Sequence, residues 1–387
     1  MLSTQRYLGW LLFGFMALAG CTSGPVTDKG LASLGQEGLR LAEQLNQRLP
    51  HSTSLDGAGY VLEDKAANLY SVVQAQSQGT PARPPEGVKA LFYQPTTPRA
   101  LLRAHSAQRA FFKASGEWLP VLRAVSETGT TKFAFVQGEQ LYAGYAVADQ
   151  LNAWAGDTRS GCPDGRAAYY CNGVLVRATD FSSDYHSWEN NPRNADMNMV
   201  SSSWFRVDQR MRATFTRQGF VMQPVGLPSA YEVQVRCIFV QDASTGDTSR
   251  DTCVVREPCL PRYNTPEKWI SAFSGQALSC RLHPSETGVQ LMTAVRQHPG
   301  FIDIGYDYNE LVLAYWPSGV GRDLPLSAFF YSSRSLSPDP VEAGQAGARF
   351  IQRDFLETEG EYRPVVGFHP GDKRVPFSYD LDDQSYE

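Results

Sequence analysis

The sequence predicts an α+β protein in which a disulfide-stapled domain of mixed helices and strands follows a mostly helical N-terminal region. Three observations predict this fold class. Apolar residues recur at helical spacing in the first part of the chain, short β-branched runs and helical stretches follow one another irregularly in the second, and six of the seven cysteines lie beyond Leu151. A hydrophobic content of 42% and a charged content of 19% are typical of a chain that buries a core.

The first 20 residues have the pattern of a lipoprotein signal peptide. Arg6 precedes an uncharged apolar run over residues 7–18, and Leu18-Ala19-Gly20-Cys21 has the order of a lipobox. The run is shorter than the about 20 residues that a transmembrane helix needs. We therefore expect cleavage before Cys21, acylation of that cysteine (palmitate included), and a membrane lipid anchor. Thr22 gives no retention signal of the kind that an aspartate gives, which favours the outer membrane. An ordinary cleaved signal or a buried apolar N-terminus is the alternative.

Residues 21–30 are expected to be a tether between the lipid and the folded protein. In the mostly helical region that follows, residues 31–150, periodic apolar positions predict helices over residues 31–49, 100–112 and 141–154. Three prolines and two glycines over residues 76–87 predict a loop. This region carries no motif with a chemical function.

Residues 151–370 are expected to form the mixed domain. Apolar or alternating runs predict strands over residues 168–178, 201–207, 231–240 and 310–316. One helix is expected to begin after Thr265, a capping residue that precedes Pro266 and Glu267. Two more helices are expected over residues 285–297 and 341–356. Residues 371–387, with Asp380, Asp382 and Asp383, are expected to be a solvated acidic tail.

Six cysteines in an exported chain indicate three disulfides. Six cysteines allow 15 pairings, and the sequence does not choose among them. We expect the sequential pairing Cys162–Cys171, Cys237–Cys253 and Cys259–Cys280. Zinc is the competing explanation, but no CxxC pair, HExxH helix or Cys/His cluster is present, so no metal site is expected.

Charge and motifs exclude several classes of function. The formal net charge is −5 and no basic stripe occurs, which argues against nucleic-acid binding. The chain has no GxSxG nucleophile elbow, no GxxxxGK[ST] phosphate loop and no GxGxxG turn before a helix.

Several spaced stretches beyond Leu151 carry a resemblance to a known family. They are Leu151-Asn152 with Asp157-Thr158-Arg159-Ser160-Gly161-Cys162, Tyr170-Cys171-Asn172-Gly173-Val174-Leu175-Val176-Arg177, Tyr185-His186-Ser187-Trp188, Tyr308-Asn309-Glu310-Leu311-Val312-Leu313, Leu324-Pro325-Leu326 and Ala328-Phe329-Phe330-Tyr331. Over about residues 151–365 they resemble the halovibrin family of secreted bacterial proteins. The resemblance implies an ADP-ribosyltransferase-like core and cleavage of NAD, which is then a substrate, so no cofactor is expected.

Cleavage of the nicotinamide–ribose bond passes through an oxocarbenium-like transition state, so an anion beside the ribose lowers the barrier. By resemblance to the Arg–Ser–Glu class of ADP-ribosyltransferases, Glu310 would be the catalytic carboxylate. Arg177 would bind the pyrophosphate, and Ser201 or Ser203 would supply a hydroxyl. Tyr308 stands where that class usually has a second acid or a glutamine. Its presence argues against transfer to an arginine side chain and favours hydrolysis of NAD.

Aromatic side chains could bind the nicotinamide or the adenine by stacking. His186 and Trp188 lie in a loop rich in Asp, Asn and Pro, and either could form such a contact. The alternative is that they fix the loop to the core. For Glu310 the alternative is a strand-edge carboxylate, and for Arg177 a structural ion pair.

Two hypotheses about function therefore stand. The first is an envelope-anchored NAD glycohydrolase, with ADP-ribosyl transfer as its less favoured form. The second is a non-catalytic envelope lipoprotein that binds a glycan, peptidoglycan or a protein partner, whose identity the sequence does not give. The first requires Arg177, one of the serines 201–203 and Glu310 to line one cleft.

Overall fold

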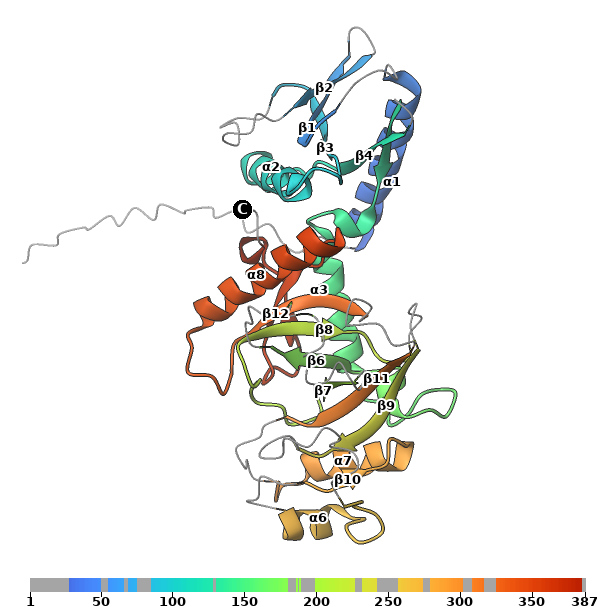
Figure 1. Ribbon diagram of the computed structural model, residues 1–387, viewed down its shortest axis with the longest axis vertical. Helices are drawn as coiled ribbons and strands as arrows, with labels where there is room; N and C mark the ends of the chain where they lie inside the picture. Colours follow the sequence, from blue (N-terminus) through green and yellow to red (C-terminus); the bar gives the residue numbers. More distant parts are fainter. Residues whose placement is uncertain are drawn as a thin grey trace, which may run out of the picture.

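The computed structural model describes residues 28–49, 55–65, 69–74, 85–127, 130–179, 186, 188, 199–226, 232–241, 257–273, 279–301, 308–316 and 325–384. These residues form two sheets arranged one above the other along the long axis, with helices α6 and α7 at the far end (Figure 1). The expected mixed α+β class is confirmed. The predicted signal peptide, its Cys21 and the start of the tether lie outside the described residues.

The N-terminal unit is built on a five-stranded sheet of order β2-β1-β3-β4-β5. Its strands are β1 (Ala58–Asp64), β2 (Leu69–Gln74), β3 (Val88–Tyr93), β4 (Val121–Glu127) and β5 (Thr130–Phe135). Neighbouring strands are antiparallel except β3 and β4, which are parallel. Helix α1 (Asp28–Arg48) covers one face and α2 (Ala100–Ser115) the other, because alternate strand residues enter two separate apolar clusters.

The expectation that residues 31–150 are mostly helical was wrong. Its helices are present, but five strands lie between them. Helices cover both faces of this sheet, so a strand such as β3 is apolar at consecutive positions instead of alternate ones. Such short runs lack the period that distinguishes a strand from a buried helix segment.

The second unit contains a nine-stranded sheet of order β10-β9-β11-β7-β6-β8-β12-β13-β14. The strands are β6 (Val174–Ala178), β7 (Met199–Phe205), β8 (Gln218–Met222), β9 (Glu232–Phe239), β10 (Arg281–Leu282), β11 (Glu310–Trp316), β12 (Leu326–Ser332), β13 (Val365–Phe368) and β14 (Phe377–Ser378). Among the pairs of these described strands, β12 with β13 is parallel and the others are antiparallel. Its helices are α3 (Ala143–Gly156), α6 (Pro266–Phe273), α7 (Glu286–Gln297) and α8 (Val341–Glu359).

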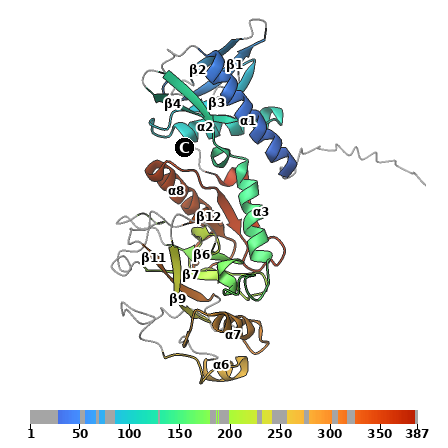
Figure 2. The same cartoon turned by 90° about the vertical axis from the view of Figure 1, so that its right-hand side faces the viewer.

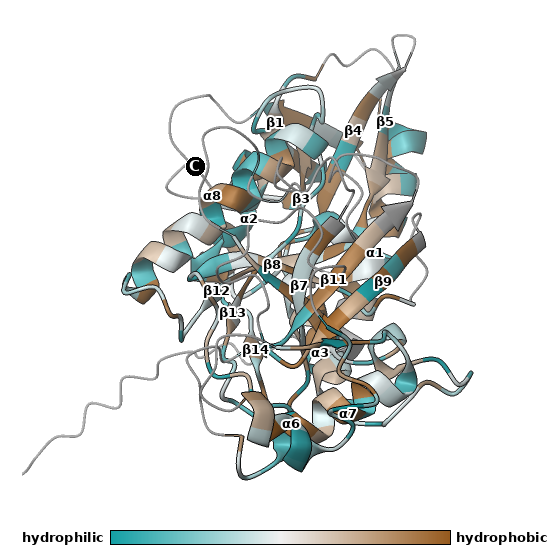
Figure 3. Ribbon diagram, turned by 60° about the horizontal axis from the view of Figure 1, so that its bottom comes forward, coloured by the Kyte–Doolittle hydropathy of each residue, from teal (hydrophilic) through white to brown (hydrophobic). Residues whose placement is uncertain are grey.

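Helices α3 and α8 lie on opposite sides of the central strands (Figure 2). Ala348 and Phe355 of α8 pack with Phe329, whereas Leu151 of α3 packs with Phe330 on the other face. Figure 3 shows apolar segments along strands β4 and β9. Helix α2 has mixed colours, as expected for a helix with one buried face.

The predicted boundary at residue 150 falls inside α3. Because α3 packs on β6, β13 and β14, the boundary lies before that helix.

Most elements predicted in the second unit are confirmed. Strands β7, β9 and β11 and helices α6, α7 and α8 lie where the pattern placed them, and α1, α2 and α3 do so in the first 156 residues. The predicted strand over residues 168–178 is only half correct. It begins as a 3₁₀ helix, η2 (Ala168–Tyr170), and only β6 is extended.

Two of the three expected disulfides are confirmed. Cys162 is bonded to Cys171 and Cys259 to Cys280. Cys237 is also disulfide-bonded, but Cys253, its expected partner, lies outside the described residues.

The expectation of a solvated acidic tail holds for the exposed residues 371–375 and was wrong for residues 376–384, which pack on the protein. Phe377 is fully buried, and Tyr379 donates a hydrogen bond to the carbonyl of Leu141 at 2.6 Å. Asp382 accepts one from Lys113 at 2.8 Å. The carboxylates are therefore ion-pair and hydrogen-bond partners, and apolar residues between them hold the segment to the core. A charge count does not reveal this arrangement.

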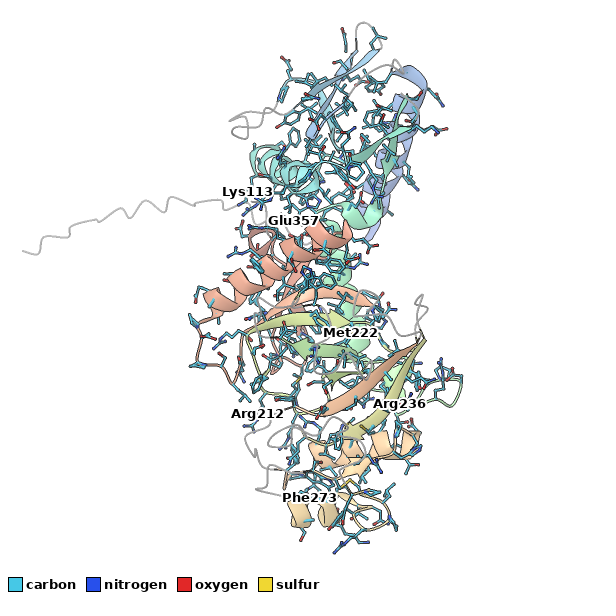
Figure 4. All side chains as sticks on the ribbon, viewed as in Figure 1. Lys113, Arg212, Met222, Arg236, Phe273 and Glu357 are labelled. Carbon is cyan, nitrogen blue, oxygen red and sulfur yellow. A yellow bond between two sulfur atoms is a disulfide. The ribbon has the colours of Figure 1, made fainter. Side chains whose placement is uncertain are left out.

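The same segment and α8 join the two units. Figure 4 labels Lys113 and Glu357, which lie at this junction. Arg99 donates to Glu357 at 2.8 Å, and Leu356 and Tyr362 are buried among apolar residues of α2 and β3. Among the described residues, no helix combines the length and hydropathy that crossing a bilayer requires.

Candidate functional site

Strand β7 changes its partner halfway along its length. Ser203, Trp204 and Phe205 pair with β6, whereas residues Met199–Ser202 pair with β11. On each edge of β7 the backbone pairing thus covers only part of the strand. Because a ladder that ends leaves space and unpaired backbone groups beside it, the change of partner creates a natural place for a cavity.

A cavity of about 230 Å³ opens at this point. Three neighbouring strands and the segment after β7 supply its lining. The lining residues are Val176, Arg177, Ala178, Ser201, Ser202, Ser203, Met211, Thr214, Phe215, Tyr308, Asn309 and Glu310.

Five of the predicted site residues therefore meet in one cavity: Arg177, Ser201, Ser203, Tyr308 and Glu310. They come from positions more than 130 residues apart in the chain. The order β11-β7-β6 brings them together, because it places β7 between the strand of Glu310 and the strand of Arg177.

Glu310 is the first residue of β11 and is 4% exposed. Its backbone pairs with Phe239 of β9, while Val312 pairs with Ser201 of β7. Residues two apart in a strand share a face, so Glu310 and Ser201 are diagonal neighbours. The Ser201 hydroxyl donates to Glu310 Oε1 at 2.6 Å, the length of a charge-assisted bond.

Arg177 lies one residue beyond the last pair between β6 and β7. Its Nη1 donates to the carbonyl of Ser201 at 2.6 Å, which brings the guanidinium beside the serine whose hydroxyl binds Glu310. Of the described residues that line this cavity, Arg177 carries the one positive side chain and Glu310 the one carboxylate. A cation and an anion are thus both bonded to Ser201, the first through its carbonyl and the second through its hydroxyl.

Asn309 is a lining residue to which the sequence gave no role. Its side chain is 2% exposed and bonds to the backbone of Trp204 in both directions. Oδ1 accepts from the Trp204 N–H at 2.8 Å and Nδ2 donates to the Trp204 carbonyl at 2.8 Å. Nδ2 also donates to Gln209 Oε1 at 2.9 Å. The amide takes the place of the ladder bonds that β11 no longer supplies.

Phe215 is a second lining residue that sequence reasoning missed. Phe215 is 51% exposed, so part of its ring is accessible at the cavity. Backbone bonds from Leu336 to Thr214 and from Ser337 to Phe215 hold its segment in place. The available signal was an aromatic residue between two threonines in a stretch without helical or strand period.

His186 and Trp188 lie elsewhere. Neither lines the cavity. Trp188 is fully buried and donates to Asp354 of α8 at 2.9 Å, and His186 Nδ1 lies 2.6 Å from the same carboxylate. The two rings are stacked with centroids 5.0 Å apart. This arrangement corresponds to the alternative in which the aromatics fix the loop to the core.

In the part of the chain that the structure describes, nowhere do three or more His, Cys, Asp or Glu side chains gather in a way that could hold a metal ion. The cavity has the chemistry of a site for an organic ligand with both a positive and a negative region.

No family model matches this chain, and no curated protein is significantly similar to it.

Proposed function

We propose that this protein hydrolyses NAD to ADP-ribose and nicotinamide, with the cavity at β7 as its active site. One observation carries the proposal. Arg177, Ser201 and Glu310, on three neighbouring strands, line one cavity, and Ser201 bonds to the Glu310 carboxylate at 2.6 Å. This is the arrangement that the NAD-cleaving hypothesis required and that a binding lipoprotein did not require.

Glu310 is the catalytic carboxylate in this proposal. When the bond between ribose C1′ and the nicotinamide nitrogen breaks, its electron pair goes to the nicotinamide ring, and positive charge develops on the ribose. Water then adds to C1′ and releases a proton. A buried carboxylate stabilises the developing charge more than an exposed one, because little water screens it. The hydroxyl of Ser201 keeps that carboxylate oriented.

Arg177 binds the pyrophosphate, since a guanidinium can donate two parallel hydrogen bonds to phosphate oxygens. Phe215 supplies the aromatic surface. Its exposed ring at the cavity offers a face on which a nicotinamide or an adenine can stack. The cavity volume suits one half of a dinucleotide, so the other half extends over the rim.

Tyr308 favours hydrolysis over transfer to an arginine side chain. It lines the cavity two residues before Glu310, where a second acid or a glutamine would orient an acceptor. A tyrosine there supplies no carboxylate to bind a guanidinium. Water is then the acceptor that the site can accommodate.

The resemblance of residues 151–365 to the halovibrin family points to the same activity and to export. We place the protein in the bacterial envelope, bound to the outer membrane through lipid on Cys21. Metabolic labelling with a fatty acid tests this: wild type should be labelled and Cys21→Ser should not. Equal labelling of both would contradict the lipid anchor.

The activity is tested by incubating residues 22–387 with NAD and following nicotinamide release. Wild type should release it, whereas Ser201→Ala, which loses the hydroxyl bonded to Glu310, should be slower. Ser115→Ala, which removes an exposed hydroxyl of α2 that bonds locally at the end of its own helix and lies outside the cavity lining, is the matched control. No release by the wild type would instead favour a non-catalytic envelope lipoprotein that binds a glycan, peptidoglycan or a protein.

A further inference from the structure

The position of the Glu310 carboxylate depends on how β11 is joined to β7. The last backbone pair between them is Leu311 with Ser202. Glu310 therefore has a backbone pair in β9 but none in β7. At this edge of the cavity the distance between the two strands must be fixed by something other than the ladder.

The side-chain amide of Asn309 makes that connection. It binds both the N–H and the carbonyl of Trp204 at 2.8 Å, so it acts as an additional ladder pair between β11 and β7. Gln209 orients this amide by accepting from Nδ2 at 2.9 Å, and Gln209 in turn donates to Thr293 of α7 at 3.3 Å. The amide is almost completely buried, so water cannot replace these bonds.

We propose that Asn309 is a positioning residue that sets the distance between Glu310 and Ser201, an inference that rests on the function proposed above. Asn309 does not act on NAD. It fixes the backbone one residue before the catalytic carboxylate, and a displacement of about 1 Å there is enough to misplace a charge that must stabilise the transition state.

The side chain must be an amide for this purpose. One of its atoms accepts from Trp204 N–H while the other donates to Trp204 carbonyl. An ionised aspartate has the same shape but only accepts, so one of its oxygens would face the Trp204 carbonyl oxygen. The strands then separate, or the carboxyl takes up a proton and donates through its O–H.

Asn152 provides a matched control. Its amide makes the same two-way contact with another strand, donating to the Phe377 carbonyl at 2.8 Å and accepting from the Phe377 N–H at 2.9 Å. That contact joins α3 to β14 and does not involve the cavity lining. Asn152→Asp and Asn309→Asp thus introduce the same chemical defect at two places, only one of which adjoins Glu310.

The test compares the two variants in the purified full chain. For Asn309→Asp we expect kcat for nicotinamide release to fall at least about tenfold, with KM changed less than about threefold, because orientation and not substrate binding is lost. The ratio of its kcat to that of wild type should rise as the pH is lowered, as the new carboxyl is protonated. For Asn152→Asp the ratio should stay within about twofold of one at every pH, although its melting temperature falls.

Two further measurements keep the outcomes distinct. Gln209→Met is a milder change and should lower kcat severalfold. If Asn309→Asp does not fold, Gln209→Met serves as the test variant in its place. A crystal structure of the variant should show the Ser201 Oγ to Glu310 Oε1 distance increased beyond 3.5 Å. Unchanged kcat in both variants, equal loss in Asn152→Asp, or a retained 2.6 Å contact would overturn the inference. If the wild type releases no nicotinamide, the NAD proposal fails, and the crystal structure still decides the positioning role.

Discussion

The carboxylate of Glu310 lies almost out of contact with water, and the Ser201 hydroxyl is one of its partners. Glu310→Gln keeps the shape and removes the charge. We expect kcat to fall about 10²–10³-fold with little change in KM, the usual effect of losing one well-placed electrostatic group. Steady-state nicotinamide release measures this. Equal activity in a variant with an unchanged circular dichroism spectrum would remove Glu310 from the mechanism.

Arg177 should behave differently. Arg177→Lys keeps the charge and loses the planar fork that donates two parallel bonds to phosphate. We expect KM for NAD to rise with a smaller effect on kcat. The two variants together thus separate a residue that stabilises the transition state from one that binds substrate. Variants with the same kinetic pattern would argue against this division of roles.

His105 is a buried histidine of α2, away from the cavity. It lies against the Tyr362 ring, and its Nε2 donates to the carbonyl of Glu139 at 2.6 Å. Burial lowers the pKa of His105 from 6.5 to about 3. Between these two values only the unfolded chain binds the proton, so stability is complete above pH 6.5 and is lost as the pH falls towards 3.

The wild type should therefore lose more stability on acidification than His105→Gln, whose amide can still donate to Glu139. Between pH 7 and pH 4.5 we expect the difference in that loss to be about 2.5 kcal/mol, from 1.36 kcal/mol per pH unit. Urea unfolding at the two pH values measures it. His283→Gln, at an exposed histidine, is the control, and the same difference there would contradict the assignment.

At the scale of elements, α7 supports the segment that carries Met211, Thr214 and Phe215. Arg296 of α7 is fully buried, donates to the Val240 carbonyl at 2.8 Å and also binds the carbonyl of Arg210. The Cys259–Cys280 disulfide fixes the chain before α7, and both sulfurs belong to the main apolar cluster. A cavity wall thus depends on an element that contributes no lining residue.

Replacing Cys259 and Cys280 by serine should lower the free energy of unfolding by about 3 kcal/mol, the entropy of a closed loop of this length. Urea unfolding of the oxidised protein and the double variant measures the loss. Alkylation without reductant, followed by mass spectrometry, should label none of the six cysteines from Cys162 to Cys280. Two or more labelled cysteines would show that the expected bridges are incomplete.

At the scale of the whole molecule, the C-terminal segment holds the two units together. The Phe377 ring stacks on Phe368 with centroids 4.9 Å apart, and Gln384 exchanges hydrogen bonds with the backbone of Val365 at 2.9 and 2.8 Å. Arg109 and Lys113 of α2 both bind Asp382. The segment therefore contributes to the apolar clusters of both units, since Phe377 belongs to that of the second unit and Leu381 to that of the first.

Truncation after Pro376 should lower the free energy of unfolding by at least about 4 kcal/mol, since loss of one buried phenylalanine alone costs 3–5 kcal/mol. Chemical denaturation followed by tryptophan fluorescence measures it. Val375→Ser, at a 52% exposed position just before the segment, should have little effect. A truncated protein as stable as the wild type would show that the segment is dispensable.

The sequence by itself determined what depends on neighbouring residues. Period and capping are local properties, so the sequence predicted strand β9 from its alternation and the start of α6 from its proline. It predicted β11 from the apolar run that begins at Glu310. The disulfides Cys162–Cys171 and Cys259–Cys280 join cysteines only 9 and 21 residues apart. The expected resemblance to the Arg–Ser–Glu class of ADP-ribosyltransferases predicted site roles for Arg177, Ser201, Ser203, Tyr308 and Glu310, which line one cavity.

Only the tertiary structure decided which distant segments meet. The partner change of β7, the amide of Asn309 in place of ladder bonds and the exposed ring of Phe215 all depend on contacts between chain segments far apart. The strands of the N-terminal sheet were missed because burial on both faces removes their alternation. The sequence predicted a solvated Asp382 because its cationic partners Arg109 and Lys113 lie about 270 residues earlier, and no local pattern encodes such a pairing.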